Sequence, residues 1–173
     1  MDNRGVQVPV SLLLDPDQTA TTKVIWMTQR RHPDDGPAQL RAHTGLSPNT
    51  IRHGLAKVPA FSRTRGGALV TVPGALLADR SVGAQTKVLY GLLQATPDFR
   101  GASGRFSYAS LRALTHLSRS TLKQAIADLT GAGWVRVTQE NRLKPITFTL
   151  GTPELIRSQA EAAAAERRLI RAK

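Results

Sequence analysis

The sequence predicts a mainly helical α+β protein that consists of two similar units and a C-terminal helix. Between Phe106 and Val137, apolar residues recur every three or four positions on both sides of Ser118. This spacing predicts two helices with one buried stripe each. Glycines then end the second helix, and the alternating segment that begins at Trp134 predicts a strand. Much of the same pattern occurs a second time, closer to the N-terminus.

The break between the two predicted helices is very short. It spans residues 115–117 and is followed by Ser118, whose hydroxyl can accept a hydrogen bond from a free amide at the start of the second helix. Helices joined by so tight a turn cross steeply, which is the geometry of a helix–turn–helix. With the strand that follows, the order is that of a winged helix. We therefore expect two tandem winged-helix domains, at residues 1–71 and 72–151, and a C-terminal helix over residues 152–173.

The repeat is visible as two ordered offsets. The segments VP, LL and TKV begin at residues 8, 12 and 22, and they recur at residues 72, 76 and 86, an offset of 64. The segments LRA and LS begin at residues 40 and 46, and they recur at residues 111 and 117, an offset of 71. The difference places about seven additional residues in the loop 97–105, where an insertion costs little. Two ordered offsets indicate a duplicated domain.

In chain order, each copy first predicts a helix, at about Thr19 to Arg31 and about Gly83 to Ala95. Trp26 and Tyr90 are equivalent residues of these helices, and we expect both to anchor the core rather than to stack on a ligand. Lys23 and Lys87 are also equivalent. They could contact phosphates or cover the helix surface with their alkyl stems, and the sequence leaves this choice open.

The helix–turn–helix of the first copy runs from Pro37 to about Val58. Pro37 suits the first turn of a helix, Gly45 suits the turn that ends it, and Ser47 can cap the second helix. Gly54 weakens that helix by about 1 kcal/mol relative to alanine. We therefore expect a packing reason for this glycine.

A wing is expected after each helix–turn–helix. In the first copy, residues 60–62 and 68–72 flank a turn that carries Arg63 and Arg65, which predicts a hairpin. In the second copy, residues 134–138 should pair with residues 146–150, and Arg142 and Lys144 lie in the turn between them. Residues 70–73 would both end the first wing and lead into the second domain. A connection this short should fix the orientation of the two domains.

The tail after Gly151 is rich in alanine with intermixed charges, which favours a helix. Thr152 can cap it, Pro153 can begin it, and we expect Leu155 and Ile156 to dock on the second domain. The rest of the helix could pack there, pair with another copy of the chain to form a homo-oligomer, or fray. The sequence leaves these alternatives open.

The charge balance predicts an anionic partner. The chain has 24 Lys and Arg against 12 Asp and Glu, a net charge of +12 and a pI near 11.4. It has no cysteine, so neither disulfides nor thiolate metal clusters are expected. No apolar run is long enough for a membrane span, and the first residues lack the pattern of a signal peptide. We expect a cytoplasmic protein associated with the nucleoid or a plasmid.

The second helix of each helix–turn–helix leaves a polar face, which in winged helices can enter the major groove. Asn and Arg there can pair with adenine and guanine edges, and the wing arginines can reach the backbone or a minor groove. A solvated helix face is the alternative. The candidate residues for contacts with double-stranded DNA are Asn49, Thr50, Arg52, His53, Lys57, Arg63 and Arg65 in the first copy, and Arg119, Ser120, Lys123, Gln124, Arg142 and Lys144 in the second.

Both copies carry motifs that point to one family. The segments VPVSLLLD and TTKVIW, with VPGALLAD and QTKVLYGLL, are followed by LRAHTGLSPNTI and LRALTHLSRSTL. Over residues 8–150 they resemble the bacterial helix–turn–helix domain of plasmid and phage replication proteins. The resemblance implies a tandem winged-helix initiator that binds double-stranded origin sites. The same fold also serves transcription regulation and partition.

Enzymatic function is not expected. The four histidines show no metal-ligand spacing with carboxylates, and no glycine-rich phosphate loop ends in Lys-Ser or Lys-Thr. We expect neither a bound metal nor a cofactor. Besides a sequence-specific DNA binder, two hypotheses remain: a winged-helix adaptor that docks proteins, and an architectural protein that binds DNA without sequence preference.

Overall fold

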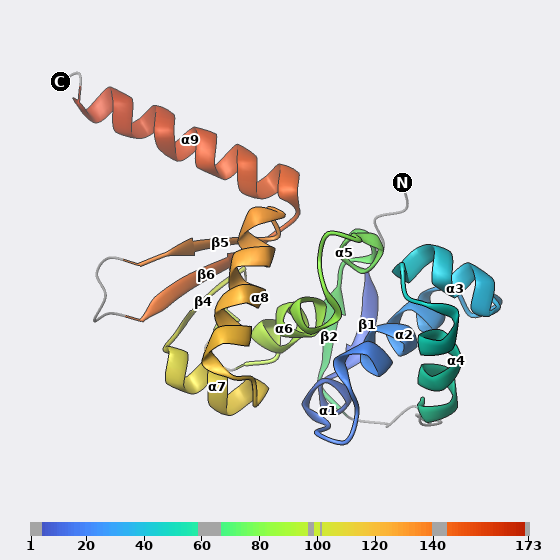
Figure 1. Ribbon diagram of the computed structural model, residues 1–173. Coiled ribbons are helices and arrows are strands. Elements are labelled where there is room, and N and C mark those ends of the chain that lie inside the picture. The colour runs from blue at the N-terminus through green and yellow to red at the C-terminus, as the bar shows by residue number, and fades with distance from the viewer. Residues whose placement is uncertain (1–4, 59–66, 97–98, 101, 140–144, 172–173) are drawn as a thin grey trace.

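The computed structural model is mainly helical, with two small antiparallel sheets (Figure 1). It describes residues 5–58, 67–96, 99–100, 102–139 and 145–171. This confirms the α+β, mainly helical class that the sequence predicts.

Within residues 5–58, the first copy has one strand and four helices. They are β1 (Val6–Pro9), α1 (Val10–Leu14), α2 (Ala20–Arg31), α3 (Pro37–Thr44) and α4 (Pro48–Lys57). Local chemistry explains the helix starts: the hydroxyl of Thr19 accepts from the backbone amide of Thr22, Pro37 is the first residue of α3, and the hydroxyl of Ser47 accepts from the amide of Thr50.

The second copy repeats this order and extends it. Its elements are β2 (Leu69–Val72), α5 (Gly74–Ala78), α6 (Ala84–Gln94), β3 (Phe99–Arg100), β4 (Ser103–Phe106), α7 (Tyr108–Thr115), α8 (Arg119–Gly131), β5 (Val135–Thr138) and β6 (Ile146–Leu150). The final helix is α9 (Pro153–Arg171). The predicted order of helix, turn, helix and strand is thus present in this copy.

The second sheet has the strand order β3-β4-β6-β5. The predicted pairing of the last two strands is confirmed, with Val135 opposite Leu150. The interpretation of residues 97–105 as a plain insertion loop was wrong, because β4 pairs along β6 and places Phe106 opposite Ile146. The short segment Ser103–Phe106 has no apolar residue before its last position. Its strand therefore depends on the neighbouring strand rather than on its own alternation.

The strand β2 pairs with β1, which lies close to the N-terminus (Figure 1). The sequence predicts that residues 68–72 pair with residues 60–62, which lie outside the described residues. The described partner of β2 is instead Val6–Pro9. Most of the segment 70–73, expected to be a short linker, therefore lies in β2. Together β1 and β2 form a two-stranded antiparallel ribbon that joins the two copies.

This ribbon relates the two copies by an approximate two-fold axis. Val6 pairs with Val72, the equivalent of Val8 at the offset of 64, while Val8 pairs with Val70, the equivalent of Val6. The helices follow the same exchange, because α1 contacts α6 while α5 contacts α2. In Figure 1, a half-turn about the view direction, centred on β1 and β2, would exchange α5 with α1 and α3 with α7. Such reciprocal contacts are typical of a two-fold dimer.

One apolar core runs through both copies. It includes Val8 and Leu12 of the first copy, Leu77 and Leu89 of the second, and Phe148 of the second sheet. A smaller cluster of Ile25, Leu40 and Ile51 lies beneath the first helix–turn–helix. The predicted boundary between residues 71 and 72 falls inside β2, at a place where the two halves share their core.

The two helix–turn–helix turns have the same construction. Each first helix ends at a left-handed residue, Gly45 with φ 71° and His116 with φ 55°. In both, a threonine hydroxyl donates to a carbonyl one turn earlier: Thr44 to Leu40 at 2.8 Å and Thr115 to Leu111 at 2.7 Å. The predicted break around His116 is confirmed.

Two further expectations concern packing. Tyr90 is buried and meets Trp134 edge to face, with ring centroids 6.4 Å apart, while Trp26 is half-buried against the same core. Both therefore pack as expected of core residues. Gly54 lies against Ile25, whose terminal methyl occupies the place that a β-carbon would take. The expected packing reason for this glycine is thereby found.

The helix α9 leaves the body of the molecule (Figure 1) and contacts it through β5. Thr152 accepts a hydrogen bond from the amide of Leu155 at 3.3 Å, as a cap should. Ile156 is buried, but Leu155 is 48% exposed, so the expectation that both residues dock was wrong for Leu155. Among the helices that the structure describes, none combines the length and apolarity required to cross a membrane.

Candidate nucleic-acid interface

The outer face of α4 carries the first group of expected DNA-contacting residues. Asn49, Arg52, His53 and Lys57 are exposed, and Thr50 is half-buried. The opposite face packs inward, where Ile51 is fully buried. The amphipathic pattern thus fixes which side of α4 faces solvent.

The outer face of α8 carries the second group. Arg119, Ser120, Lys123 and Gln124 are all exposed. The buried face of this helix includes Leu122 and Leu129, which pack into the shared core.

The two faces correspond position by position. At the offset of 71, Asn49 corresponds to Ser120, Arg52 to Lys123, and His53 to Gln124. All six side chains are exposed. Each pair is polar, and the central pair carries a positive charge in both copies. The duplication has therefore kept hydrogen-bonding residues at the same three positions of the second helix. The correspondence ends at Lys57, whose equivalent is Asp128.

Three of the candidate side chains already hold hydrogen bonds within the protein. The hydroxyls of Thr50 and Ser120 lie 2.7 Å and 2.9 Å from the hydroxyls of the capping residues Ser47 and Ser118. The amide nitrogen of Gln124 donates to Asp128 at 2.7 Å. Arg52, Lys123 and Arg119 are consequently the stronger candidates for direct contacts with bases or phosphates.

The helix starts also favour an anion. Neither α4 nor α8 has an acidic residue in its first turn, so the positive end of each helix dipole is not compensated locally.

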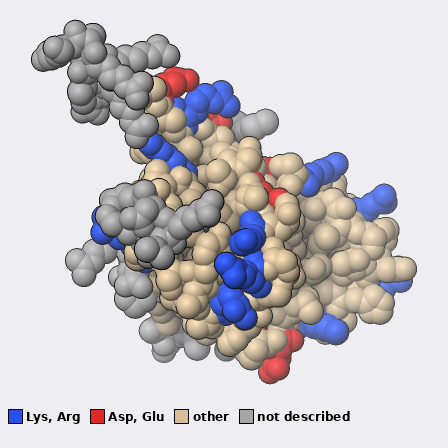
Figure 2. Space-filling model, turned by 60° about the vertical axis from the view of Figure 1, so that its left-hand side comes forward, with Lys and Arg blue, Asp and Glu red and all other residues tan. Residues whose placement is uncertain are grey.

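The surface also carries grouped positive charge. On the face shown in Figure 2, Lys and Arg side chains gather in a band near the centre. The candidate wing residues Arg63, Arg65, Arg142 and Lys144 lie outside the described residues.

The paired lysines take neither of the two roles that the sequence leaves open. Lys23 and Lys87 are buried, and each ammonium donates to a backbone carbonyl, of Leu13 and of Leu77 respectively, at 2.7 Å. Neither is placed to contact a phosphate.

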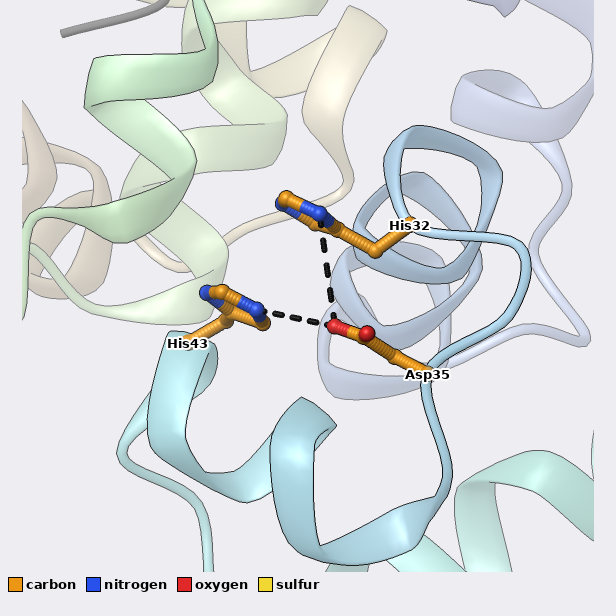
Figure 3. Close-up of side chains that lie close together, drawn as sticks. All are labelled: His32, Asp35 and His43. Carbon is orange, nitrogen blue, oxygen red and sulfur yellow. Dashed lines mark ion pairs between the residues drawn. The ribbon is translucent and has the colours of Figure 1, made fainter.

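The structure brings together a second group of polar residues that spacing did not reveal. His32, Asp35 and His43 place one potential metal-ligand atom each within 4.8 Å of the others (Figure 3). The absence of metal-ligand spacing in the sequence therefore does not exclude a cluster of such residues in the fold, and the expectation of no bound metal stays a prediction. Asp35 lies in the turn after α2, and His43 is in α3. Their convergence depends on how two helices pack, so sequence spacing alone could not find it.

Comparison with protein-family models, with curated proteins and with solved structures finds no match for this chain.

Proposed function

We propose that the protein binds specific sequences of double-stranded DNA through its two helix–turn–helix units, α3–α4 and α7–α8. The observation that carries this proposal is the matched set of exposed polar residues on α4 and α8. Arg52 and Lys123 occupy the same position of the second helix, and polar residues flank both. A helix that offers such side chains at its N-terminal end suits the major groove.

The charge of the chain supports the same partner. A net charge of +12 attracts a polyanion, and contacts with phosphates hold a protein on a duplex while base contacts select the sequence. The resemblance of both copies to helix–turn–helix domains of replication proteins supports a role in replication initiation or transcription regulation of a plasmid or mobile element. The projecting helix α9 is the element that we propose for contacts with a second copy of the chain.

Selection of bound duplexes from a random pool, with the full chain, tests the proposal. An enriched consensus that competes against scrambled duplexes is the expected result. Binding to the selected site should weaken with salt, with a slope of about −0.9 in log K against log salt for each phosphate neutralised.

Two other outcomes would replace the proposal. Salt-dependent binding without any enriched sequence would indicate an architectural DNA-binding protein. No duplex binding even at low salt would exclude the DNA function and leave the protein-docking adaptor.

A further inference from the structure

Three side chains converge where α2 gives way to α3. His32 follows the last residue of α2, Asp35 lies in the turn, and His43 projects from α3 toward both (Figure 3). The Asp35 Oδ2 atom lies 2.8 Å from His43 Nε2 and 4.0 Å from His32 Nδ1. We propose that these residues bind one divalent transition-metal ion, of which Zn²⁺ is the representative.

The distances between these side chains are close to those between the ligands of a tetrahedral metal site. Two ligands at 2.0–2.2 Å from a tetrahedral ion are roughly 3.3–3.6 Å apart. The two observed distances lie on either side of that range. The imidazole rings are stacked, with centroids 4.1 Å apart and planes 4° from parallel. Because the lone pairs of parallel rings do not converge, ion binding requires the ring of His32 to turn toward Asp35.

The carboxylate oxygen between the rings needs either a protonated imidazole or a metal ion beside it. Asp35 Oδ2 is shielded from solvent, and no group of the described residues lies in hydrogen-bond geometry to it. The His43 Nε2 atom lies 2.8 Å away and forms an ion pair with this oxygen only when the imidazole is protonated. A buried oxygen of this kind is costly unless a hydrogen bond or a cation satisfies it. An ion that both histidines and this oxygen coordinate would satisfy it, and the three side chains are exposed enough, at 25–38%, to admit one.

The duplication provides an internal comparison. His32 and His43 correspond to Thr96 and Leu114 in the second copy, while Asp35 corresponds to Phe99 or Phe106, depending on the offset. None of these residues is a metal ligand. In contrast, the residues that build the turn recur in both copies, as Thr44 and Thr115 do. The second copy therefore forms its helix–turn–helix without these three polar residues.

The ligand set selects the class of ion. Imidazole nitrogen with one carboxylate suits Zn²⁺, Co²⁺ or Ni²⁺, whereas Mg²⁺ and Ca²⁺ prefer sites made of oxygen ligands. Three protein ligands leave one tetrahedral position for water or for a group from a partner. Bound here, the ion would connect the end of α2 to α3, the first helix of the helix–turn–helix.

The test uses the full chain without an affinity tag, because a histidine tag would itself bind the ion. After treatment with chelator, the protein is titrated with Zn²⁺ by calorimetry and with Co²⁺ by visible absorption. We expect one ion per chain and a Co²⁺ spectrum typical of nitrogen and oxygen ligands. Zn²⁺ should also raise the temperature of thermal unfolding, because an ion that binds only the folded state stabilises it.

Variants identify the ligands. His43→Ala and Asp35→Asn should weaken Zn²⁺ binding by at least about tenfold and abolish the rise in unfolding temperature. His53→Ala, which removes an exposed histidine of α4, should leave both the Zn²⁺ affinity and the rise in unfolding temperature unchanged.

Circular dichroism checks that each variant is folded, and Asp35→Asn preserves the shape of the side chain. If the wild type binds no ion in stoichiometric amount, or if His53→Ala loses as much affinity as His43→Ala, the proposal is wrong. Neither readout depends on DNA binding.

Discussion

The ammonium group of Lys87 donates a hydrogen bond of 2.7 Å to the carbonyl oxygen of Leu77, and Lys23 makes the same bond, at the same length, to Leu13. Both acceptors lie in the last turn of a short helix, where carbonyl groups lack a partner within the helix. Buried lysines are rare unless they are paired. The repetition of this bond in both copies indicates that it holds α1 against α2 in the first copy and α5 against α6 in the second.

Lys87 should make stability depend on pH. Burial lowers the pKa of Lys87 to about 8, against the opposing effect of Asp79. Between this pKa and that of the unfolded chain, the unfolded state binds more protons, so the free energy of unfolding should rise as pH increases. We expect a rise of the order of 1–3 kcal/mol between pH 8 and 10. Lys87→Met should reduce this rise and leave the part that comes from Lys23, whose pKa burial also lowers. Urea unfolding at several pH values measures both.

The measurement should stop at pH 10. Burial raises the pKa of Tyr90 to about 12, so the unfolded chain loses this proton first and stability falls above pH 10. A wild-type stability that rises between pH 8 and 10 no more than that of Lys87→Met would contradict the role given to Lys87.

The two turn residues predict opposite effects on stability. His116 adopts a left-handed conformation, with φ 55°, that glycine adopts without strain, and Gly45 occupies the equivalent position of the first copy. His116→Gly should therefore stabilise the protein by up to about 1 kcal/mol, whereas Gly45→Ala should destabilise it by about 1 kcal/mol. Chemical denaturation of both variants measures this pair. Equal signs for the two changes would show that side-chain contacts, not the backbone, decide.

The sequence was most informative where local chemistry decides the structure. Ser47 and Ser118 cap their helices, and Gly45 ends α3, as the residue types predict. It was least informative where distant segments meet. Nothing in the segment 69–72 specifies that its partner is Val6–Pro9, because an alternating strand fits any edge of suitable register. The convergence of His32, Asp35 and His43 is hidden for the same reason.

On the candidate interface, two arginines test the reading of bases. Arg52→Ala and Arg119→Ala should each reduce the preference for the selected site over a scrambled duplex, by about 1–3 kcal/mol if the lost contact is bidentate. Arg157→Ala removes an exposed arginine that lies on neither α4 nor α8; it is the matched control and should leave the preference unchanged. Competition binding at fixed salt measures all three. The base-reading role fails if both helix variants keep the wild-type preference.

The shared core predicts that the second copy does not fold alone. A fragment of residues 67–173 keeps β2 but loses its partner β1, together with the core residues Val8 and Leu12. We expect this fragment to lack a cooperative thermal transition and dispersed amide resonances, because buried apolar surface and strand pairing are both removed. Cooperative unfolding of the isolated fragment would instead support two independent domains.

The two-fold relation between the copies also predicts the form of the DNA site. Since a half-turn relates the two helix–turn–helix units, they should meet the duplex in inverted orientation, as the halves of a dimer do. We expect a degenerate inverted repeat whose halves are about one helical turn, or 10 base pairs, apart on one side of the duplex.

Inserting about 5 base pairs between the halves turns the second half to the opposite side. Binding should then fall to that of a duplex with one half-site scrambled, which is the control. A flexible insertion after Thr71 cannot restore it, because Thr71 pairs with Gln7 within the ribbon. If the protein binds the half-turn duplex as tightly as the original site, the two units are not held in a fixed orientation.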